Sequence, residues 1–400
     1  MTDDSHRSRR TILRTGATVA AAGLIAGCTS DGNGSGNGNG DTEGGNGNGN
    51  GNGSGDSSGN GDSDDGNGSS ESYSVTMEPV GTLEFDSVPE TWAANNGSWA
   101  DMGIALGQQP PEAVYLTDRY HTQYYDEIPD VSVDKSDMTA LWADELDPEE
   151  FIELSGDVDM FVMDPNFLIN RGGWDQGDID QIESTGTPFF GNSIFSQDYT
   201  WHDYEFLSLY EAFEKLAEVF QEQERYEAFA SLHDEFQDEV DAIVPPEDER
   251  PDVAIVWPAG DDTFYPYTIG DGTGYKQWRD LGVGDALGKA GVSDFTSDRG
   301  TIDYENLLEI DPDVLLLRGP SNESLTAEEF QNQVVAEMEN HDIASELTAV
   351  QNGDVYRGGP LYQGPIANLV LTERAAQDLY GVEEELFDRQ EVSDIVNGDF

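Results

Sequence analysis

From residue 73 onward, the order of apolar and polar positions predicts short strands that alternate with helices. Apolar runs of strand length are separated by stretches in which apolar residues recur with helical spacing. In the first part, the expected strands cover residues 91–94, 113–117, 158–163 and 188–191, and the expected helices cover residues 97–107, 148–155 and 178–184. This alternation predicts βαβ units and a mainly parallel sheet.

Two amphipathic helices are expected in the middle of the chain, because apolar residues recur there at every third or fourth position. They are Phe206, Leu209, Phe213, Leu216 and Phe220 in the first helix, and Phe229, Leu232, Phe236, Val240 and Ile243 in the second. The second helix should cover residues 225–244 and be roughly 30 Å long at 1.5 Å per residue. Pro245-Pro246 should end it, because proline lacks a backbone N–H.

The last part of the chain returns to alternating strands and helices. Expected strands cover residues 252–257, 313–317 and 354–357, and expected helices cover residues 275–281, 304–310, 327–340 and 368–379. The predicted fold class is therefore α/β, with two Rossmann-like lobes joined by one long α-helix and a mainly parallel sheet flanked by helices in each lobe. We expect an N-lobe at residues 73–204, a helical hinge region at 205–246, and a C-lobe with a C-terminal tail at 247–400.

The first 27 residues have the pattern of an export signal. Arg9-Arg10 precede a small-residue apolar run at 17–26, which is too short to span a bilayer because spanning takes roughly 20 residues. The twin arginines resemble a twin-arginine signal, and residues 25–28 resemble a lipobox, in which the cysteine is acylated and becomes the first residue. Cys28 is the only cysteine, so it has no disulfide partner within one chain.

We therefore expect a signal peptide at residues 1–27 and a lipid anchor at Cys28, on the extracytoplasmic face of the cell membrane. A short transmembrane stub with an incidental cysteine is the alternative. Glycine fills 16 of the 40 positions from 31 to 70, and no large apolar residue occurs there. Residues 28–72 are therefore expected to be a disordered tether.

The charge of the chain is extremely negative, with 82 Asp and Glu against 18 Lys and Arg and a net charge of −64. Self-repulsion of this size destabilises a compact state at low ionic strength, and molar salt screens it. The composition is thus typical of an extreme halophile. A calcium-binding protein is a weaker interpretation, because the acids are spread along the whole chain. Nucleic acid is not expected as a partner, because the sequence has no basic patch that could neutralise phosphates.

Four segments resemble one family when taken in order. They are "PETWAANNGSWADMGIALGQ" at 89–108, "LDPEEFIELSGDVDMFV" at 146–162, "TIDYENLLEIDPDVLLL" at 301–317 and "NGDVYRGG" at 352–359. Together with the lipobox and the long helix, they resemble the single-helix-hinged class of ABC-transporter substrate-binding proteins, which serve iron-siderophore, haem and cobalamin uptake. The second segment departs from the family motif, with Gly-Asp in place of Lys-Pro.

The resemblance implies a monomeric receptor without catalytic activity or cofactor, whose two lobes move little and enclose a ligand cleft. It also implies an ABC permease and its ATPase as partners. In this family one glutamate on each lobe docks to arginines of the permease, and by motif position these are Glu149 and Glu305. The alternative is that both are ordinary surface acids.

Candidate ligand-binding residues follow from the rule that ligands of open α/β sheets bind beyond the carboxyl ends of strands. Aromatic and arginine side chains stand out in these polar segments, since flat ligands of mixed polarity bind against such walls. The candidates are Trp99, Phe167, Arg171, Trp174, Phe195, Trp201, Tyr265, Tyr267, Tyr275, Arg299 and Tyr362. Arg171 and Arg299 are expected to contact a ferric complex with oxygen donors, unless they form structural ion pairs.

The expected function is capture of an iron(III)-siderophore-type chelate for an ABC importer. Cobalamin, haem or a metal oxyanion remain open as ligands. Direct capture of zinc or manganese would need distant histidines to converge, because His121, His202, His233 and His341 form no closely spaced pair. An anchored extracellular hydrolase and a structural or adhesive surface protein are the alternatives of other classes.

Overall fold

The computed structural model describes residues 72–142, 146–260 and 262–400. The predicted signal peptide, Cys28 and all but the last residue of the predicted tether lie outside the described residues. All described residues belong to one compact unit. Within these ranges, no helix is long and apolar enough to cross a membrane.

The described chain begins with a hairpin that the helix and strand patterns do not predict. Strands β1 (Tyr73–Met77) and β2 (Gly81–Phe85) pair in antiparallel fashion. Val75 and Met77 alternate with exposed residues and enter the core, as the two-residue period of a strand requires. The hairpin packs on helix α5 (Leu209–Phe220), where the Tyr73 hydroxyl donates a hydrogen bond of 2.5 Å to the Val219 carbonyl.

The N-lobe contains a four-stranded parallel sheet in the order β5-β4-β3-β6. Its strands are β3 (Trp92–Ala94), β4 (Ala113–Val114), β5 (Thr139–Ala140) and β6 (Met160–Val162), and its helices include α1 (Gly97–Ala105), α2 (Pro148–Leu154) and α4 (Gln176–Glu183). The strand expected at 188–191 is reduced to one bridge between Phe161 and Phe189. The prediction of a parallel sheet flanked by helices is confirmed.

The C-lobe sheet has the order β10-β8-β7-β11-β12, with β9 also paired to β7. Its strands are β7 (Asp252–Gly260), β8 (Thr263–Tyr267), β9 (Gly284–Asp285), β10 (Ile302–Asp303), β11 (Val314–Leu317) and β12 (Val355–Arg357). Strands β7, β9, β11 and β12 are parallel, whereas β8 and β10 are antiparallel to their neighbours. The antiparallel strands are a departure from the predicted βαβ pattern.

Short helices cover the C-lobe sheet. They are α7 (Lys276–Asp280), α8 (Ala286–Lys289), α9 (Phe295–Asp298), α10 (Tyr304–Ile310), α11 (Pro320–Glu323), α12 (Ala327–Phe330), α13 (Ala336–Asn340) and α14 (Thr348–Asn352). The single helix expected at 327–340 contains a π-helical turn at Gln331–Val335 between α12 and α13.

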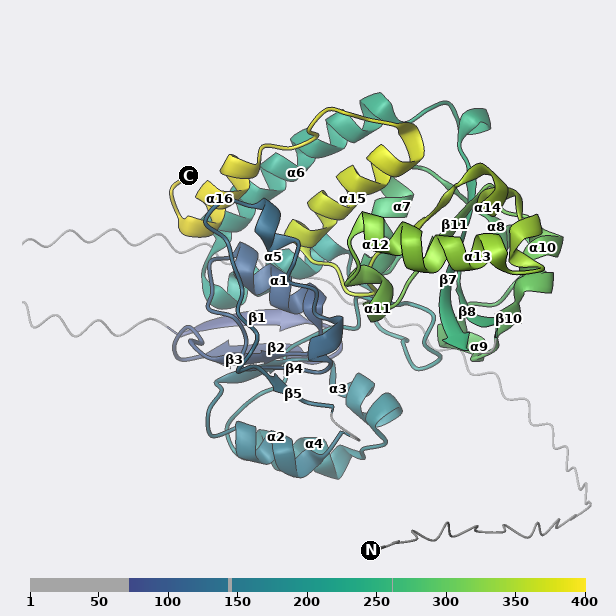
Figure 1. Cartoon of the computed structure of the whole chain (residues 1–400). Helices are drawn as coiled ribbons and strands as arrows, with labels where there is room; N and C mark the ends of the chain where they lie inside the picture. The colour runs from purple at the N-terminus through teal and green to yellow at the C-terminus, as the bar shows by residue number, and fades with distance from the viewer. Residues whose placement is uncertain (1–71, 143–145, 261) are drawn as a thin grey trace, which may run out of the picture. The chain divides into compact units, whose positions relative to one another are not determined.

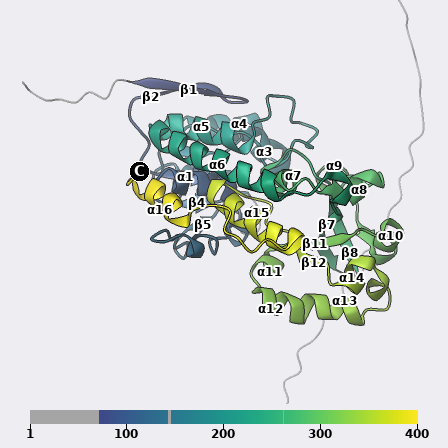
Figure 2. The ribbon, with the colours of Figure 1, turned by 90° about the horizontal axis from the view of Figure 1, so that it is seen from above.

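Four longer helices pack beside the N-lobe sheet (Figures 1 and 2). They are α5 (Leu209–Phe220), α6 (Gln223–Ile243), α15 (Pro365–Tyr380) and α16 (Arg389–Asn397). Two of them, α6 and α15, extend toward the C-lobe sheet. Helix α6 is the long helix expected at 225–244, and it ends just before Pro245. The helices α15 and α16 are part of the segment 247–400, yet they also pack against α1 and α6.

Alternate strand residues face different cores, and one of these cores runs through both lobes. Ala94 and Val162 of the N-lobe belong to the same buried cluster as Ile255 and Leu316 of the C-lobe, with Phe236 of α6 among them. The neighbouring strand residues face two separate outer clusters, one in each lobe. Because close-packed interiors resist deformation, this shared core favours small movements between the lobes.

Candidate functional site: an arginine and tyrosine pocket

A pocket of about 340 Å³ lies between segments of the two lobes. This volume is at the lower end of the range for small-molecule sites, roughly 300–1,000 Å³. Its lining consists of Tyr115, Arg119, Phe167, Arg171, Phe195, Ser196, Tyr199, Trp257, Tyr265, Tyr267, Tyr275, Phe295, Thr296, Arg299, Leu361 and Tyr362. Ten of these sixteen side chains are aromatic and three are arginines, so the wall combines flat apolar faces with positive charge.

The N-lobe part of the wall is built on segments that follow parallel strands. Tyr115 and Arg119 come after β4, and Phe167 and Arg171 come after β6. Asp164 caps the short helix that carries Phe167, because its carboxylate accepts a 2.9 Å hydrogen bond from the Asn166 N–H. Both pairs therefore lie beyond the carboxyl ends of strands, as the rule for open α/β sheets requires.

The C-lobe part of the wall is built mainly on the hairpin of β7 and β8. Trp257 of β7 lies opposite Tyr265 of β8, and Tyr267 shares the face of Tyr265 because side chains alternate along a strand. Phe295 of α9 packs on Tyr265 with ring centroids 4.1 Å apart. Arg299 follows α9 in the left-handed conformation, at φ 59°, and its guanidinium lies 4.8 Å from the centroid of the Phe295 ring.

The pocket is positively charged although the protein is strongly acidic. Among the described residues that line it, Arg119, Arg171 and Arg299 are cationic and none is Asp or Glu. Arg119 lies 4.9 Å from the centroid of the Trp257 ring, which bridges the two lobes by a cation–π contact. A planar guanidinium donates paired hydrogen bonds to carboxylate-like oxygens, so this arrangement can bind an anion.

Burial keeps several tyrosines of the wall neutral at ordinary pH. Burial raises the pKa of Tyr115 to about 12, although the nearby Arg119 and Arg171 act in the opposite direction. Burial also raises the pKa of Tyr199, Tyr267 and Tyr362. Each of these phenols therefore keeps its proton and can donate a hydrogen bond to an anionic ligand.

Arg318 supports the tyrosines from behind the pocket. It is fully buried, and its guanidinium lies 5.5 Å from the Tyr267 ring and 4.6 Å from the Tyr275 ring. It donates hydrogen bonds to the backbone carbonyls of Gly358, at 3.3 Å, and Gly274. A buried cation behind the wall adds to the positive potential of the site.

The structure brings together eight of the eleven ligand-binding candidates. Phe167, Arg171, Phe195, Tyr265, Tyr267, Tyr275, Arg299 and Tyr362 line the pocket.

Three tryptophans do not line the pocket, which corrects the sequence expectation. Trp99 belongs to α1 and is fully buried in the core. Trp174 donates its indole N–H to the Leu146 carbonyl at 3.0 Å and packs against Phe151. Trp201 stacks on Tyr199 at 4.7 Å, one layer behind the wall. Large rings near strand ends fill core space as readily as they line clefts.

The pocket also contains residues that sequence reasoning missed, among them Tyr115, Arg119, Tyr199, Trp257 and Phe295. The signal for the first two was present, because a shorter strand at 113–114 places them in the segment after its carboxyl end. Trp257 is the last residue of the strand expected at 252–257, where an aromatic side chain normally belongs to the core. Its place on the pocket face depends on the antiparallel partner β8.

The two predicted docking glutamates occupy equivalent positions. Glu149 and Glu305 are both exposed, and each is the second residue of its helix, α2 or α10. An aspartate caps each helix, Asp147 for α2 and Asp303 for α10. Over the described ranges, no group of three or more His, Cys, Asp or Glu is arranged to hold a metal ion.

Comparison with known proteins identifies the family. A family model described as "Periplasmic binding protein" matches residues 159–361, just over half of the chain. The chain belongs to the periplasmic binding protein family. The matched region runs from β6 of the N-lobe to the pocket residue Leu361 of the C-lobe, so it includes elements of both walls. The expected family is confirmed, and its members are binding proteins rather than enzymes.

Solved periplasmic binding proteins share the fold at low sequence identity. The catecholate-siderophore binding protein VctP of Vibrio cholerae has a TM-score of 0.51 and 16% identity, and the match covers 78% of this chain and all of that one. The petrobactin-binding protein YclQ of Bacillus subtilis has a TM-score of 0.53 and 16% identity, and the match covers 79% of this chain and 100% of that one. The siderophore binding protein BauB, bound to acinetobactin and ferric iron, has a TM-score of 0.52 and 18% identity, and the match covers 77% of this chain and 99% of that one. No curated protein matches the sequence.

Proposed function

We propose that this periplasmic binding protein is the extracytoplasmic receptor of an ABC importer, and that it captures an iron(III)-siderophore-type chelate in the pocket. The observation that carries the proposal is the charge of the wall. Three arginines and no acids line the pocket among the described residues, in a chain of net charge −64. Maintaining a cationic pocket in so acidic a protein is consistent with selection for an anionic ligand.

The chemistry of a ferric chelate matches this wall. Its deprotonated oxygen donors give many such complexes a net negative charge, which arginines stabilise by charge-assisted hydrogen bonds. Neutral tyrosine hydroxyls can donate to the same oxygens, and the rings of Phe295 and Tyr265 offer flat surfaces to the organic part. The siderophore binding proteins that share the fold support the same ligand class.

We also propose that Glu149 and Glu305 dock to arginines of the permease. Both are exposed and stand in the first turn of a helix, one on each lobe. A pair of carboxylates on separate lobes can hold both lobes against a basic partner surface, since complementary charges orient an encounter. Attachment through Cys28 would keep the receptor close to that partner.

Ligand binding is tested by tryptophan fluorescence in molar salt, with ferric catecholates, ferric hydroxamates, haem and cobalamin as probes. We expect saturable quenching by a ferric chelate without product formation, because Trp257 lines the pocket. The variant Trp257→Phe is the matched control, and it should lose much of the quenching while still binding. Quenching by haem or cobalamin alone would show that the ligand is not a ferric siderophore-type chelate. Quenching by none of the probes would contradict the proposal.

A further inference from the structure

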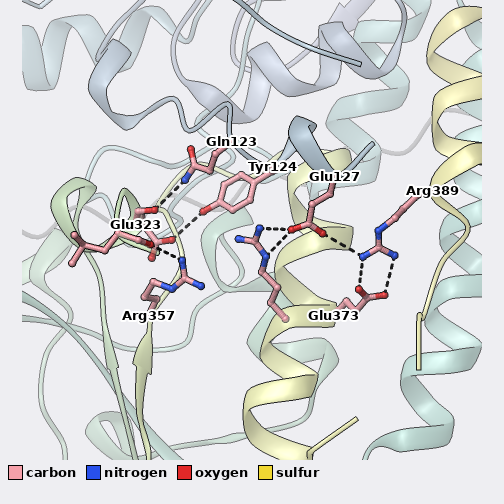
Figure 3. A network of polar contacts seen from close by, with 9 residues as sticks. Gln123, Tyr124, Glu127, Glu323, Arg357, Glu373 and Arg389 are labelled. Atoms are coloured by element: carbon pink, nitrogen blue, oxygen red, sulfur yellow. Dashed lines mark hydrogen bonds and ion pairs between the residues drawn. The ribbon is translucent and has the colours of Figure 1, made fainter. Parts of the chain in front are cut away.

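Residues 115–128, here called the strap, connect the pocket with a polar network that joins the lobes. Tyr115 and Arg119 at one end of the strap line the pocket. Gln123, Tyr124 and Glu127 at the other end make polar contacts with the C-lobe and with the C-terminal helices (Figure 3).

The first part of the network holds the strap to α11 of the C-lobe. The Tyr124 hydroxyl donates to the Glu323 carboxylate at 3.0 Å, and the Gln123 side chain donates to the Glu323 carbonyl at 3.1 Å. Tyr124 is 1% exposed and Glu323 is 4% exposed. Burial raises the pKa of Glu323, whereas the bond from Tyr124 and the charge of Arg357 lower it. Loss of that bond would leave a buried carboxylate poorly compensated.

The second part holds the strap to the C-terminal helices. The Glu127 carboxylate accepts from Arg374 of α15, whose Nε lies 3.0 Å away, and from Arg389 of α16 at 3.3 Å. Arg389 also bonds Glu373 at 2.5 Å, so two arginines alternate with two glutamates. The Arg374 guanidinium lies 5.3 Å from the centroid of the Tyr124 ring, which links the two parts of the network. A network of this kind is worth more than an isolated surface pair.

The strap has little regular structure of its own to define its course. It contains only two single turns, Thr117–Arg119 and Tyr125–Glu127. Its place is therefore determined by side-chain contacts, and Arg119 can reach Trp257 of the C-lobe only if the strap stays against that lobe.

We propose that Tyr124 and Glu127 are positioning residues that hold the strap against the C-lobe and thereby place Arg119 in the pocket. This inference rests on the proposed function only for the part that concerns ligand affinity. Neither residue is among those that line the pocket, so both act through Arg119.

A distance measurement without ligand tests whether Tyr124 and Glu127 hold the strap in place. In the full-length Cys28→Ser chain, which has no other cysteine, spin labels are placed at Asp126→Cys of the strap and Glu328→Cys of α12, both exposed positions. The double variant Y124F/E127Q should broaden the distribution of distances between the labels. An unchanged distribution would overturn the proposal. The isosteric variant Tyr124→Phe alone should give a smaller broadening, and it decides the result if the double variant does not fold.

A matched control makes the same two kinds of substitution, Tyr to Phe and Glu to Gln, at positions outside the strap. In Y356F/E218Q, a tyrosine hydroxyl loses its 3.2 Å bond to Asp354, and the side chain that lies 2.9 Å from the Lys215 ammonium loses its negative charge. Each of these contacts lies within one stretch of chain and links no strap residue. We expect this control to leave the distance distribution narrow, and a broadening equal to that of Y124F/E127Q would overturn the assignment.

Affinity for a ferric catecholate chelate tests the part that acts through Arg119. Y124F/E127Q should weaken binding by about two- to tenfold, as the loss of hydrogen bonds predicts. In the Arg119→Gln background the same pair should weaken binding by less than about twofold, because the interaction energies of coupled residues are not additive. An equal loss in both backgrounds would overturn the mechanism. If the unaltered protein binds no ferric chelate, the proposed function fails, while the label distances still decide the role of the strap.

Discussion

In the N-lobe, the pocket residues lie on irregular segments that follow parallel strands, whereas in the C-lobe several lie on an antiparallel hairpin. Arg119 and Arg171 exemplify the first arrangement, and Tyr265 and Tyr267 exemplify the second. Loops provide long cationic side chains whose positions depend on their neighbours. A hairpin presents rings at fixed spacing, since alternate residues share a face. The two walls are thus suited to different parts of one anionic ligand.

The helices that carry the proposed docking residues are alike in the two lobes, whereas the pocket walls differ. In α2 and in α10, an aspartate caps the helix and a glutamate follows two positions later. We interpret this repetition as the mark of two lobes that meet the same kind of partner surface. Under the proposed function, the pocket walls can differ because each would contact a different side of one ligand.

The largest expected effect comes from neutralising the proposed docking glutamate of each lobe. The double variant E149Q/E305Q should abolish uptake of the chelate by cells, because both lobes lose their charge for the permease, while ligand affinity stays unchanged. Each single variant should retain part of the uptake. Transport of labelled ferric chelate and a parallel binding titration measure the two quantities, and loss of binding would count against the docking assignment.

The next largest effect tests the arginines of each pocket wall separately. Replacing Arg119 or Arg171 of the N-lobe, or Arg299 of the C-lobe, by Gln should weaken binding of an anionic ferric chelate by roughly ten- to a hundredfold each, as expected for charge-assisted bonds. The pair R119Q/R171Q should weaken it further. Titration calorimetry in molar salt measures these changes. Lys215→Gln, a change of equal charge on α5, should leave affinity unchanged. Wild-type affinity in R119Q/R171Q would show that the N-lobe wall does not bind the anion.

The smallest effect concerns a contact between α1 of the N-lobe and α15. Asp101 is 1% exposed and accepts a 3.0 Å hydrogen bond from the Ala367 N–H at the start of α15. Burial raises its pKa to about 7. The native protein therefore binds this proton more tightly than the unfolded chain does, so the stability contribution is complete below about pH 4 and is lost as the pH rises to about 7.

Denaturant unfolding of the unaltered protein and of Asp101→Asn, between pH 4 and 8 in molar salt, measures this contribution. The free energy of unfolding of the unaltered protein should fall relative to the variant by up to about 1.4 kcal/mol per pH unit within that window. Because all other acids are common to both proteins, the difference isolates Asp101. Parallel curves would contradict the assignment.

Much of the fold could be predicted from periodicity. The apolar positions of α6 gave its extent to within a few residues, because a helix with one buried face needs apolar residues every third or fourth position. Strands β8 and β10 were missed, since they are only five and two residues long and a local pattern does not distinguish such a short strand from a loop. The hairpin of β1 and β2 was missed for the same reason.

The candidate site was predictable in part. The rule of strand carboxyl ends found Phe167 and Arg171, because it depends only on the order of elements along the chain. It failed for Trp99 and Trp174, which lie close to strand ends but pack into the core. Whether a ring faces a core or a cleft depends on what packs against it, and sequence spacing does not contain that information.

By itself, the sequence determined the α/β class, the long helix and the extreme negative charge, since each follows from local composition and period. Only the tertiary structure decided which arginines converge. Arg119, Arg171 and Arg299 are far apart in the chain, and they share one pocket because two sheets and a shared core bring their segments together. The same is true of Tyr124 and Glu323, whose contact spans nearly half of the chain. Long-range contacts of this kind are the product of packing, which a local pattern does not specify.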